Sequence, residues 1–272
     1  SNAQDYCVNK AIPDGSNLYY ASLFEDINHK QILISLHAFL YELTEIIHEC
    51  SDPGVARIKL HWWQEEIERL FNQQARHPVT KQFAKHLSLN EELEGSFKSI
   101  ISNFDQFLFI EQMNCLEDTL ALYDSTAGEV WQQCGAQTQT ESTDNLAPLK
   151  AMGTIYQFIN CLQEPNTYIT ETRCIIPENI VTQESLLKLR SNIQTQSNEQ
   201  QVIFAPLIQN LINRLEQLHT NLKTTPFKHA LILNRIALKT CVEIYNDGCR
   251  LLNTKTSLTP LRKLWIAWWT NI

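Results

Sequence analysis

The sequence predicts a protein built almost entirely of α-helices. Only seven glycines and nine prolines interrupt its 272 residues, and the segments between them repeat apolar residues at helical spacing. Runs in which apolar and polar residues alternate, as they do in strands, are nearly absent. Most prolines stand beside polar turn residues where helices would begin or end, and Pro206 is the exception. The expected fold class is therefore all-α.

The expected helices follow one another with short connections. A short helix over 17–24 precedes a long one over 28–50, whose apolar stripe includes Ile32, Leu36 and Phe39. The turn at 51–54 ends the long helix and caps the next one. The remaining helices are expected over 55–73, 79–87, 91–112, 116–134, 146–163, 183–193, 200–222, 227–252 and 261–269.

One domain over residues 4–272 is the simplest organisation. The hydrophobic content of 43% is enough to build a substantial core. The polar tracts 137–145 and 195–201 are short enough to be loops within one body. Residues 1–3, Ser-Asn-Ala, have the composition of a scar left by tag removal, so we set them aside.

Charge and cysteine usage narrow the functional classes. Thirty acidic against 22 basic residues give a formal charge of −8, which argues against a nucleic-acid partner because phosphate backbones attract clustered lysine and arginine. The eight cysteines include no C-x-x-C pair, so we expect reduced thiols and a cytoplasmic protein. No uninterrupted apolar run reaches the ~18 residues of a membrane-spanning helix.

Carboxylates gather on one face of the helix expected over 28–50. Glu42, Glu45 and Glu49 stand at positions i, i+3 and i+7 and therefore share a face. Carboxylate oxygens are the ligands that Mg²⁺ prefers, whereas the nearby His48 is a poor ligand for it. The same pattern is typical of a polar glutamate stripe without a metal, and we favour that interpretation.

A second polar segment closes the helix expected over 146–163. Asn160 and Glu164 lie there, and Pro165 follows at once. Proline lacks an N–H group and disfavours helical geometry in the residue before it. We therefore expect the helix to end near Glu164.

Residues 37–48, followed by residues 60–66, resemble one half of a squalene/phytoene synthase active site. That family carries an arginine followed by D-D-x-x-D. Here Tyr41 falls near the arginine, and the three aspartates correspond to Thr44, Glu45 and His48. The segments 16–21, 62–63 and 123–128 resemble further family elements, S-x-x-Y-x-A, W-W-R-x-E and Y-x-x-x-A-G, although Gln64 replaces the arginine of the second.

The second segment resembles the other half of that site. The family pattern N-x-x-R-D-x-x-x-D corresponds here to Asn160, Gln163, Glu164 and Tyr168. The following R-x-Y-L-P is matched by 173–177, with isoleucine in place of tyrosine. The resemblance therefore covers residues 16–177 in the family's order.

The resemblance implies the isoprenoid synthase fold, a single helical bundle around a central cavity. It also implies prenyl diphosphate substrates and Mg²⁺ as the cofactor of an active enzyme, with Glu45 and Glu164 as the metal ligands if any exist. The motif positions that would carry catalysis are Glu42, Glu45, His48, Glu49, Asn160 and Glu164. Those that would contact substrate are Tyr20, Phe39, Tyr41, Tyr156 and Arg173.

The departures from the family pattern leave three functional hypotheses. The loss of most aspartates and of both arginines favours a weak or inactive prenyltransferase homologue that binds a prenyl lipid. A working head-to-head prenyltransferase with glutamates in place of aspartates is the second hypothesis. The third is an assembly factor or scaffold with a protein partner, because Phe39, Glu42, Leu162 and Pro165 resemble a divergent branch that includes a mitochondrial complex I assembly factor. Under any of them, Tyr41 and Gln163 should line one cavity.

The C-terminal segment 261–269 joins two cations to three tryptophans. Packing of these tryptophans into the core is the interpretation that we favour. A peripheral membrane contact, at the inner face of the membrane, is the alternative, since tryptophan beside basic residues is typical of membrane interfaces.

Overall fold

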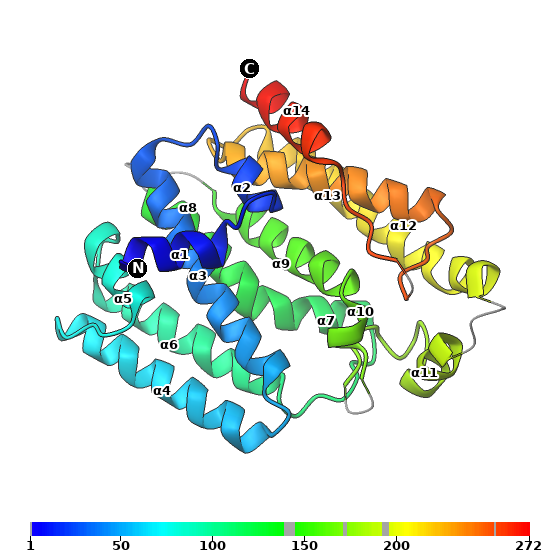
Figure 1. The fold of residues 1–272 in the computed structure, drawn as a ribbon, viewed down its shortest axis with the longest axis horizontal. Helices are drawn as coiled ribbons and strands as arrows, with labels where there is room; N and C mark the ends of the chain where they lie inside the picture. Colours follow the sequence, from blue (N-terminus) through cyan, green and yellow to red (C-terminus); the bar gives the residue numbers. More distant parts are fainter. Residues whose placement is uncertain (1, 139–144, 171–172, 192–195, 253) are drawn as a thin grey trace.

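The computed structural model describes residues 2–138, 145–170, 173–191, 196–252 and 254–272, and throughout these ranges the architecture is helical (Figure 1). The only extended pairings among the described residues are isolated bridges from Cys174 to Gln112 and to Ile169. The elements are α1 (Ala3–Ala11), α2 (Asn17–Ala21), α3 (Ile27–Glu49), α4 (Pro53–Phe71), α5 (Pro78–His86), α6 (Glu91–Gln106), α7 (Leu116–Tyr123), η1 (Asp124–Gly128), α8 (Glu129–Thr138), α9 (Ala147–Leu162), α10 (Pro165–Tyr168), α11 (Gln183–Ser191), α12 (Gln196–Leu222), α13 (Lys228–Asn246) and α14 (Pro260–Asn271). The predicted all-α class is confirmed.

Helices α1 and α10 were not among the expected elements, and α1 is the longer of the two. Its N-cap is Asn2, whose side chain accepts from the backbone N–H of Asp5 at 2.9 Å. The Asp5 carboxylate accepts in return from the Asn2 backbone, which completes a capping box. The signal was present in the sequence, but it lay in the residues that had been set aside as a tag scar.

Three other boundaries differ from the expectation for identifiable reasons. The expected helix 116–134 is interrupted by the π-helical turn η1. The expected helix 227–252 stops at Asn246, because Gly248 and Cys249 take positive φ values. The expected loop 195–201 belongs to α12 from residue 196 onward, where helix packing outweighs its polar composition. Most of the expected loop 137–145 lies outside the described residues.

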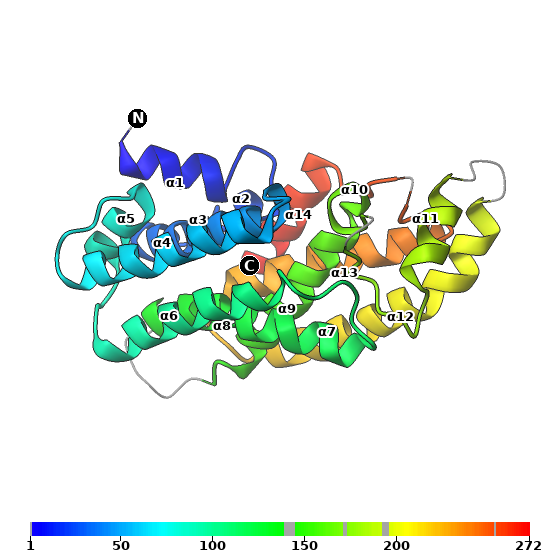
Figure 2. The same ribbon diagram turned by 90° about the horizontal axis from the view of Figure 1, so that it is seen from below.

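Helix α3 is the centre of the bundle. It packs against α1, α4, α5, α6 and α8, and Figure 2 shows α1 lying over its outer side. Its stripe is anchored by the fully buried Phe39, whose ring meets those of Trp63, Phe83 and Phe97 at centroid distances of 5.3–5.6 Å. The buried apolar side chains form one continuous core. All eight cysteines are unpaired thiols, and none of the described helices has the length and apolar composition needed to cross a bilayer.

Candidate functional site

A cleft of about 500 Å³ separates the two helices that carry the sequence motifs. Tyr41 and Thr44 of α3 line one wall, and residues of α9 and α10 line the other. The segments 13–17 and 255–258 complete its rim, together with Lys263 of α14. Tyr41 and Gln163 therefore line one cavity, as predicted.

Helix α3 turns its glutamates away from this cleft and toward α1. Lys10 of α1 makes an ion pair with Glu42 at 3.0 Å and a second, shorter one with Glu45. The hydroxyl of Tyr6 also donates to Glu42. Burial tends to lower the pKa of Lys10, but the hydrogen bonds to Glu45 and Glu42 outweigh that effect and raise it. One lysine cation thus stands beside both carboxylates and offsets part of their charge.

The motif residues of α3 that do face the interior carry no charge. The hydroxyl of Thr44 donates to the backbone carbonyl of Leu40 at 2.7 Å, so it is already used within the helix. The His48 ring contacts that of Tyr168, with centroids 4.0 Å apart, and its Nδ1 has no hydrogen-bond partner. Burial, with a further contribution from the nearby Arg173 cation, lowers the pKa of His48 to about 3. The imidazole is therefore neutral at physiological pH.

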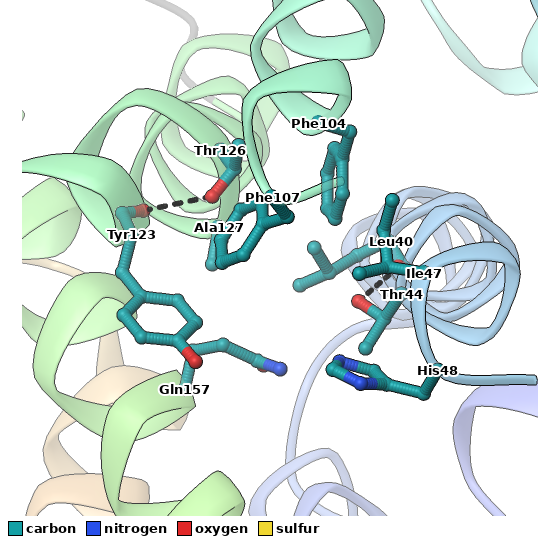
Figure 3. Close-up of a pocket in the computed structure, with 10 residues that line it drawn as sticks. All are labelled: Leu40, Thr44, Ile47, His48, Phe104, Phe107, Tyr123, Thr126, Ala127 and Gln157. Atoms are coloured by element: carbon teal, nitrogen blue, oxygen red, sulfur yellow. Dashed lines mark hydrogen bonds between the residues drawn. The ribbon is translucent and has the colours of Figure 1, made fainter. Parts of the chain in front are cut away.

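The space between these residues and the bundle interior is almost filled. Figure 3 shows His48 and Thr44 facing Tyr123 and Gln157 across this inner cavity, with two phenylalanine rings on the wall between the two sides. Its volume is about 10 Å³, which is the room needed for roughly one water molecule. The ten lining residues are Leu40, Thr44, Ile47, His48, Phe104, Phe107, Tyr123, Thr126, Ala127 and Gln157.

The opposite wall of the cleft is built where α9 ends. Helix α9 stops at Leu162, and Pro165 opens the short helix α10, so the predicted break at this proline is confirmed. Asn160 lies on the cleft and hydrogen-bonds the buried Tyr156, which also contacts Asn17. Glu164 stands in the break, where Lys255 binds it in an ion pair.

The cleft contains a second lysine, which the sequence analysis did not single out. Lys263 is only 7% exposed, donates to the carbonyl of Gly15 at 3.1 Å and lies over the ring of Tyr20. Burial lowers the pKa of Lys263, and repulsion from Lys255 lowers it further. These two cations stand at the rim of the cleft, whose lining also includes the carboxylates of Asp14 and Glu164. The signal available in the sequence was the tail after Asp247, which contains basic but no acidic residues.

The other expected site residues are divided among different surroundings. Phe39 was expected at the substrate but is fully buried in the core, where it packs against other aromatic rings instead of lining the cleft. Glu49 is exposed at the end of α3. Arg173 donates to the carbonyl of Ile47 at 2.8 Å and so ties the second motif to α3.

The motif carboxylates do not fit a magnesium site. Glu42 and Glu45 share Lys10, and Glu164 is paired with Lys255, so a lysine ammonium already stands beside each carboxylate. Magnesium requires several oxygen ligands converging in octahedral geometry. Among the described residues, one group of three side chains of the metal-binding types lies close enough together to share an ion: Glu25, Asp26 and His29, at the start of α3. Only two of these three offer carboxylate oxygens. Asp26 there already caps the helix through its side chain.

Comparison with known proteins gives a consistent picture. The family model for squalene/phytoene synthase matches residues 13–262. A dehydrosqualene synthase structure superposes with a TM-score of 0.79 at 14% identity, covering 99% of this chain and 95% of that one. The squalene synthase HpnC from Alicyclobacillus acidocaldarius gives 0.68 at 15% identity, covering 91% and 95%. The structure of TcSQS with the ligand E5700 gives 0.74 at 13% identity, covering 98% and 84%. No curated protein sequence matches the chain significantly.

Proposed function

Because the chain belongs to the squalene/phytoene synthase family, we propose that it uses the family fold to bind a single anionic prenyl compound with lysine side chains. Under this proposal it does not join two prenyl diphosphates with magnesium. The ligand lies in the cleft between α3 and α9, with its charged end toward Lys255 and Lys263.

The observation that carries this proposal concerns the motif carboxylates of the candidate site. Each of them either forms an ion pair with a lysine or is exposed to solvent. Ionising a prenyl diphosphate requires concentrated positive charge from divalent cations and from arginine or lysine at the departing group. Glu42 and Glu45 share the single cation of Lys10, Glu164 is paired with the exposed Lys255, and Glu49 is exposed. Carboxylates in those states offer no preorganised metal ligands.

The volume of the interior supports the same conclusion. Head-to-head condensation needs room for two prenyl chains beside each other, whereas the inner cavity has only about 10 Å³. The outer cleft, at about 500 Å³, falls within the range of small-molecule sites, about 300–1,000 Å³. It accommodates one ligand.

The cleft residues can recognise an anion without a metal. An arriving phosphate group competes with Glu164 for Lys255 and draws Lys263 toward its charged form, because a nearby anion raises the pKa of a lysine. The amide of Asn160 and the hydroxyl of Ser257 supply hydrogen-bond donors on the same wall. Binding should therefore be accompanied by proton uptake near the ordinary pKa range of lysine.

Calorimetric titration with farnesyl diphosphate tests the binding step. We expect equal affinity in EDTA and in Mg²⁺, and a loss of about tenfold or more for Lys255→Ala and for Lys263→Met, since each removes one charge-assisted contact. Lys188→Ala is the matched control, because Lys188 of α11 also forms a surface ion pair but does not line the cleft. Binding that requires Mg²⁺ would contradict the proposal.

A condensation assay tests the absence of chemistry. The purified protein, incubated with labelled farnesyl or geranylgeranyl diphosphate and Mg²⁺, should give no squalene, phytoene or cyclopropyl diphosphate intermediate. Turnover that disappears in Glu45→Gln or Glu164→Gln would establish the glutamate-based enzyme instead. A folded protein that binds no prenyl compound would favour the assembly-factor hypothesis.

A further inference from the structure

The C-terminal helix α14 presents an unbroken apolar stripe to the outside of the molecule. Its members are 42–83% exposed: Leu261, Leu264, Trp265, Trp268, Trp269 and Ile272. They follow the i, i+3, i+4, i+7, i+8, i+11 spacing of one helix face. The expectation that these tryptophans pack into the core is therefore wrong, because the face of α14 that packs inward is centred on Lys263 and Ala267.

The three tryptophans form a cluster with little cover from the chain. The rings of Trp265 and Trp269 are stacked with centroids 5.9 Å apart, and Trp268 lies 5.4 Å from Trp265. Figure 1 shows α14 at the edge of the bundle, packed on one side against α13. A contiguous apolar patch on an otherwise polar protein surface marks an interaction site.

The charges beside this stripe are positive, against the sign of the whole chain. Helices α13 and α14 contain five lysines and arginines and one carboxylate, Glu243, whereas the complete chain has a net charge of −8. Arg262 is paired with Glu243 and Lys263 is buried on the inward face, which leaves Lys228, Arg235 and Lys239 of α13. Lys228 donates to the carbonyl of Asn271 at 3.1 Å, and Arg235 donates to Thr270 at 2.8 Å. Both cations therefore lie next to the last turn of α14. The exposed Lys239 adds a further cation on α13.

We propose that α14 docks on the surface of an anionic lipid bilayer, with its axis in the plane of the interface. Tryptophan rings are favoured at the level of the lipid headgroups, and an amphipathic helix flanked by lysine and arginine lies in that layer without crossing it. The cations of α13 then face the negative surface potential of the lipids. In a two-fold dimer through the stripe the same cations of both copies would face each other and repel, so the charge favours an anionic bilayer over a second copy.

This docking places the cleft near the membrane. Lys263, on the inward face of α14, lines the cleft, as do residues 255–258 immediately before the helix. A helix that lies in the interface thus forms part of the rim through which a lipid-soluble ligand enters. The membrane contact itself does not depend on what the cleft binds.

Vesicle sedimentation and tryptophan fluorescence test the proposal. We expect the full chain to bind vesicles of phosphatidylcholine with phosphatidylglycerol, with a blue shift in emission, and to bind phosphatidylcholine alone at least about tenfold more weakly. The double variant Trp265→Ser/Trp269→Ser should lose at least about tenfold in partitioning, and Lys228→Gln/Lys239→Gln about fivefold for each charge removed.

The control is Ile58→Ser/Val202→Ser, which removes two side chains that are 71% and 77% exposed on other helices. It should bind anionic vesicles as the unaltered chain does. Equal vesicle binding by the double tryptophan variant would overturn the proposal, as would equal binding to neutral vesicles. Light scattering tests whether a second copy of the chain covers the stripe instead. A dimer that binds no lipid and becomes monomeric in the double tryptophan variant would assign the stripe to a second copy. Because none of these readouts involves a prenyl ligand, their failure is distinct from failure of the proposed function.

Discussion

The two walls of the cleft place their motif residues differently. On α3 the motif residues are divided among the core, helix α1, the inner cavity and solvent, so that Phe39, Glu42, His48 and Glu49 have four different surroundings. At the end of α9, the motif residues all face one space. The α3 wall is mainly a packing element, whereas the α9–α10 wall presents its polar side chains to the cleft.

The difference shows that helical spacing alone does not decide where a motif residue points. Residues three and four apart share a face, but which neighbour they meet depends on the elements packed around the helix. Lys10 on α1 draws Glu42 and Glu45 away from the cleft, and it lies in the part of α1 that covers α3. On the other wall, Lys255 comes from a loop at the rim of the cleft, so its pairing with Glu164 leaves the carboxylate inside it.

The largest expected effect is the loss of stability on Phe39→Ala, and it distinguishes a core residue from a residue of the cleft. Phe39→Ala should lower the free energy of unfolding by about 3–5 kcal/mol, because it removes a fully buried ring from an aromatic cluster. Asn160→Ala should lower it by less than about 1 kcal/mol and weaken prenyl binding instead, since Asn160 lies on the cleft. Urea denaturation and calorimetric titration of both variants measure the contrast. A small stability loss for Phe39→Ala would show that this side chain is not a core anchor.

The next prediction concerns the loss of folding stability at acidic pH. The folded-state pKa of His48 is about 3, against an ordinary value of 6.5, so between these values the unfolded chain binds a proton that the folded chain does not. Stability must therefore fall as the pH falls through this window, at up to about 1.4 kcal/mol per pH unit for one histidine. Between pH 7.5 and 5.5, His48→Gln should lose about 1 kcal/mol less than the unaltered chain.

Urea unfolding at the two pH values measures this difference. The buried His37, whose pKa burial also lowers to about 3, is present in both proteins and contributes equally. His61→Gln is the matched control, because the His61 side chain is 75% exposed. Parallel pH profiles for His48→Gln and the unaltered chain would mean that folding does not lower the pKa of His48.

Local patterns in the sequence were sufficient to predict most of the fold. Apolar stripes such as that of α3, and prolines such as Pro165, act over one or two turns, so the sequence displays them directly. The family resemblance, and not these local patterns, predicted that Tyr41 and Gln163 line one cavity, and the structure confirms it. The local patterns could not anticipate η1, where the chain remains helical and changes only its hydrogen-bond register.

The electrostatic state of the site could not be predicted in the same way. Lys10 and Glu45 are 35 residues apart, and Lys255 and Glu164 are 91 apart, so no local pattern connects them. Their pairing follows from tertiary packing alone. The outward direction of the α14 tryptophans was missed for a related reason, since a helical stripe predicts one apolar face but not which way that face points.

The last comparison is between Lys10 and Lys255, and it includes the smallest expected effect, that of Lys255→Met. Lys10 and Glu42 have side chains only 18% and 15% exposed, so Lys10→Met leaves a largely buried carboxylate without its cation and should cost about 1–2 kcal/mol. Lys255 and Glu164 are 62% and 47% exposed, and Lys255→Met should cost less than about 0.5 kcal/mol, because solvent screens the pair. The folded-state pKa of Lys10 is raised above its ordinary 10.5, so its contribution is fully present below that pH and is lost as the pH rises through the folded value. Denaturation of both variants at pH 7.5 measures the contrast, and equal costs would show that the two carboxylates are equally solvated, so that the α3 wall would be as open to ligand as the α9–α10 wall.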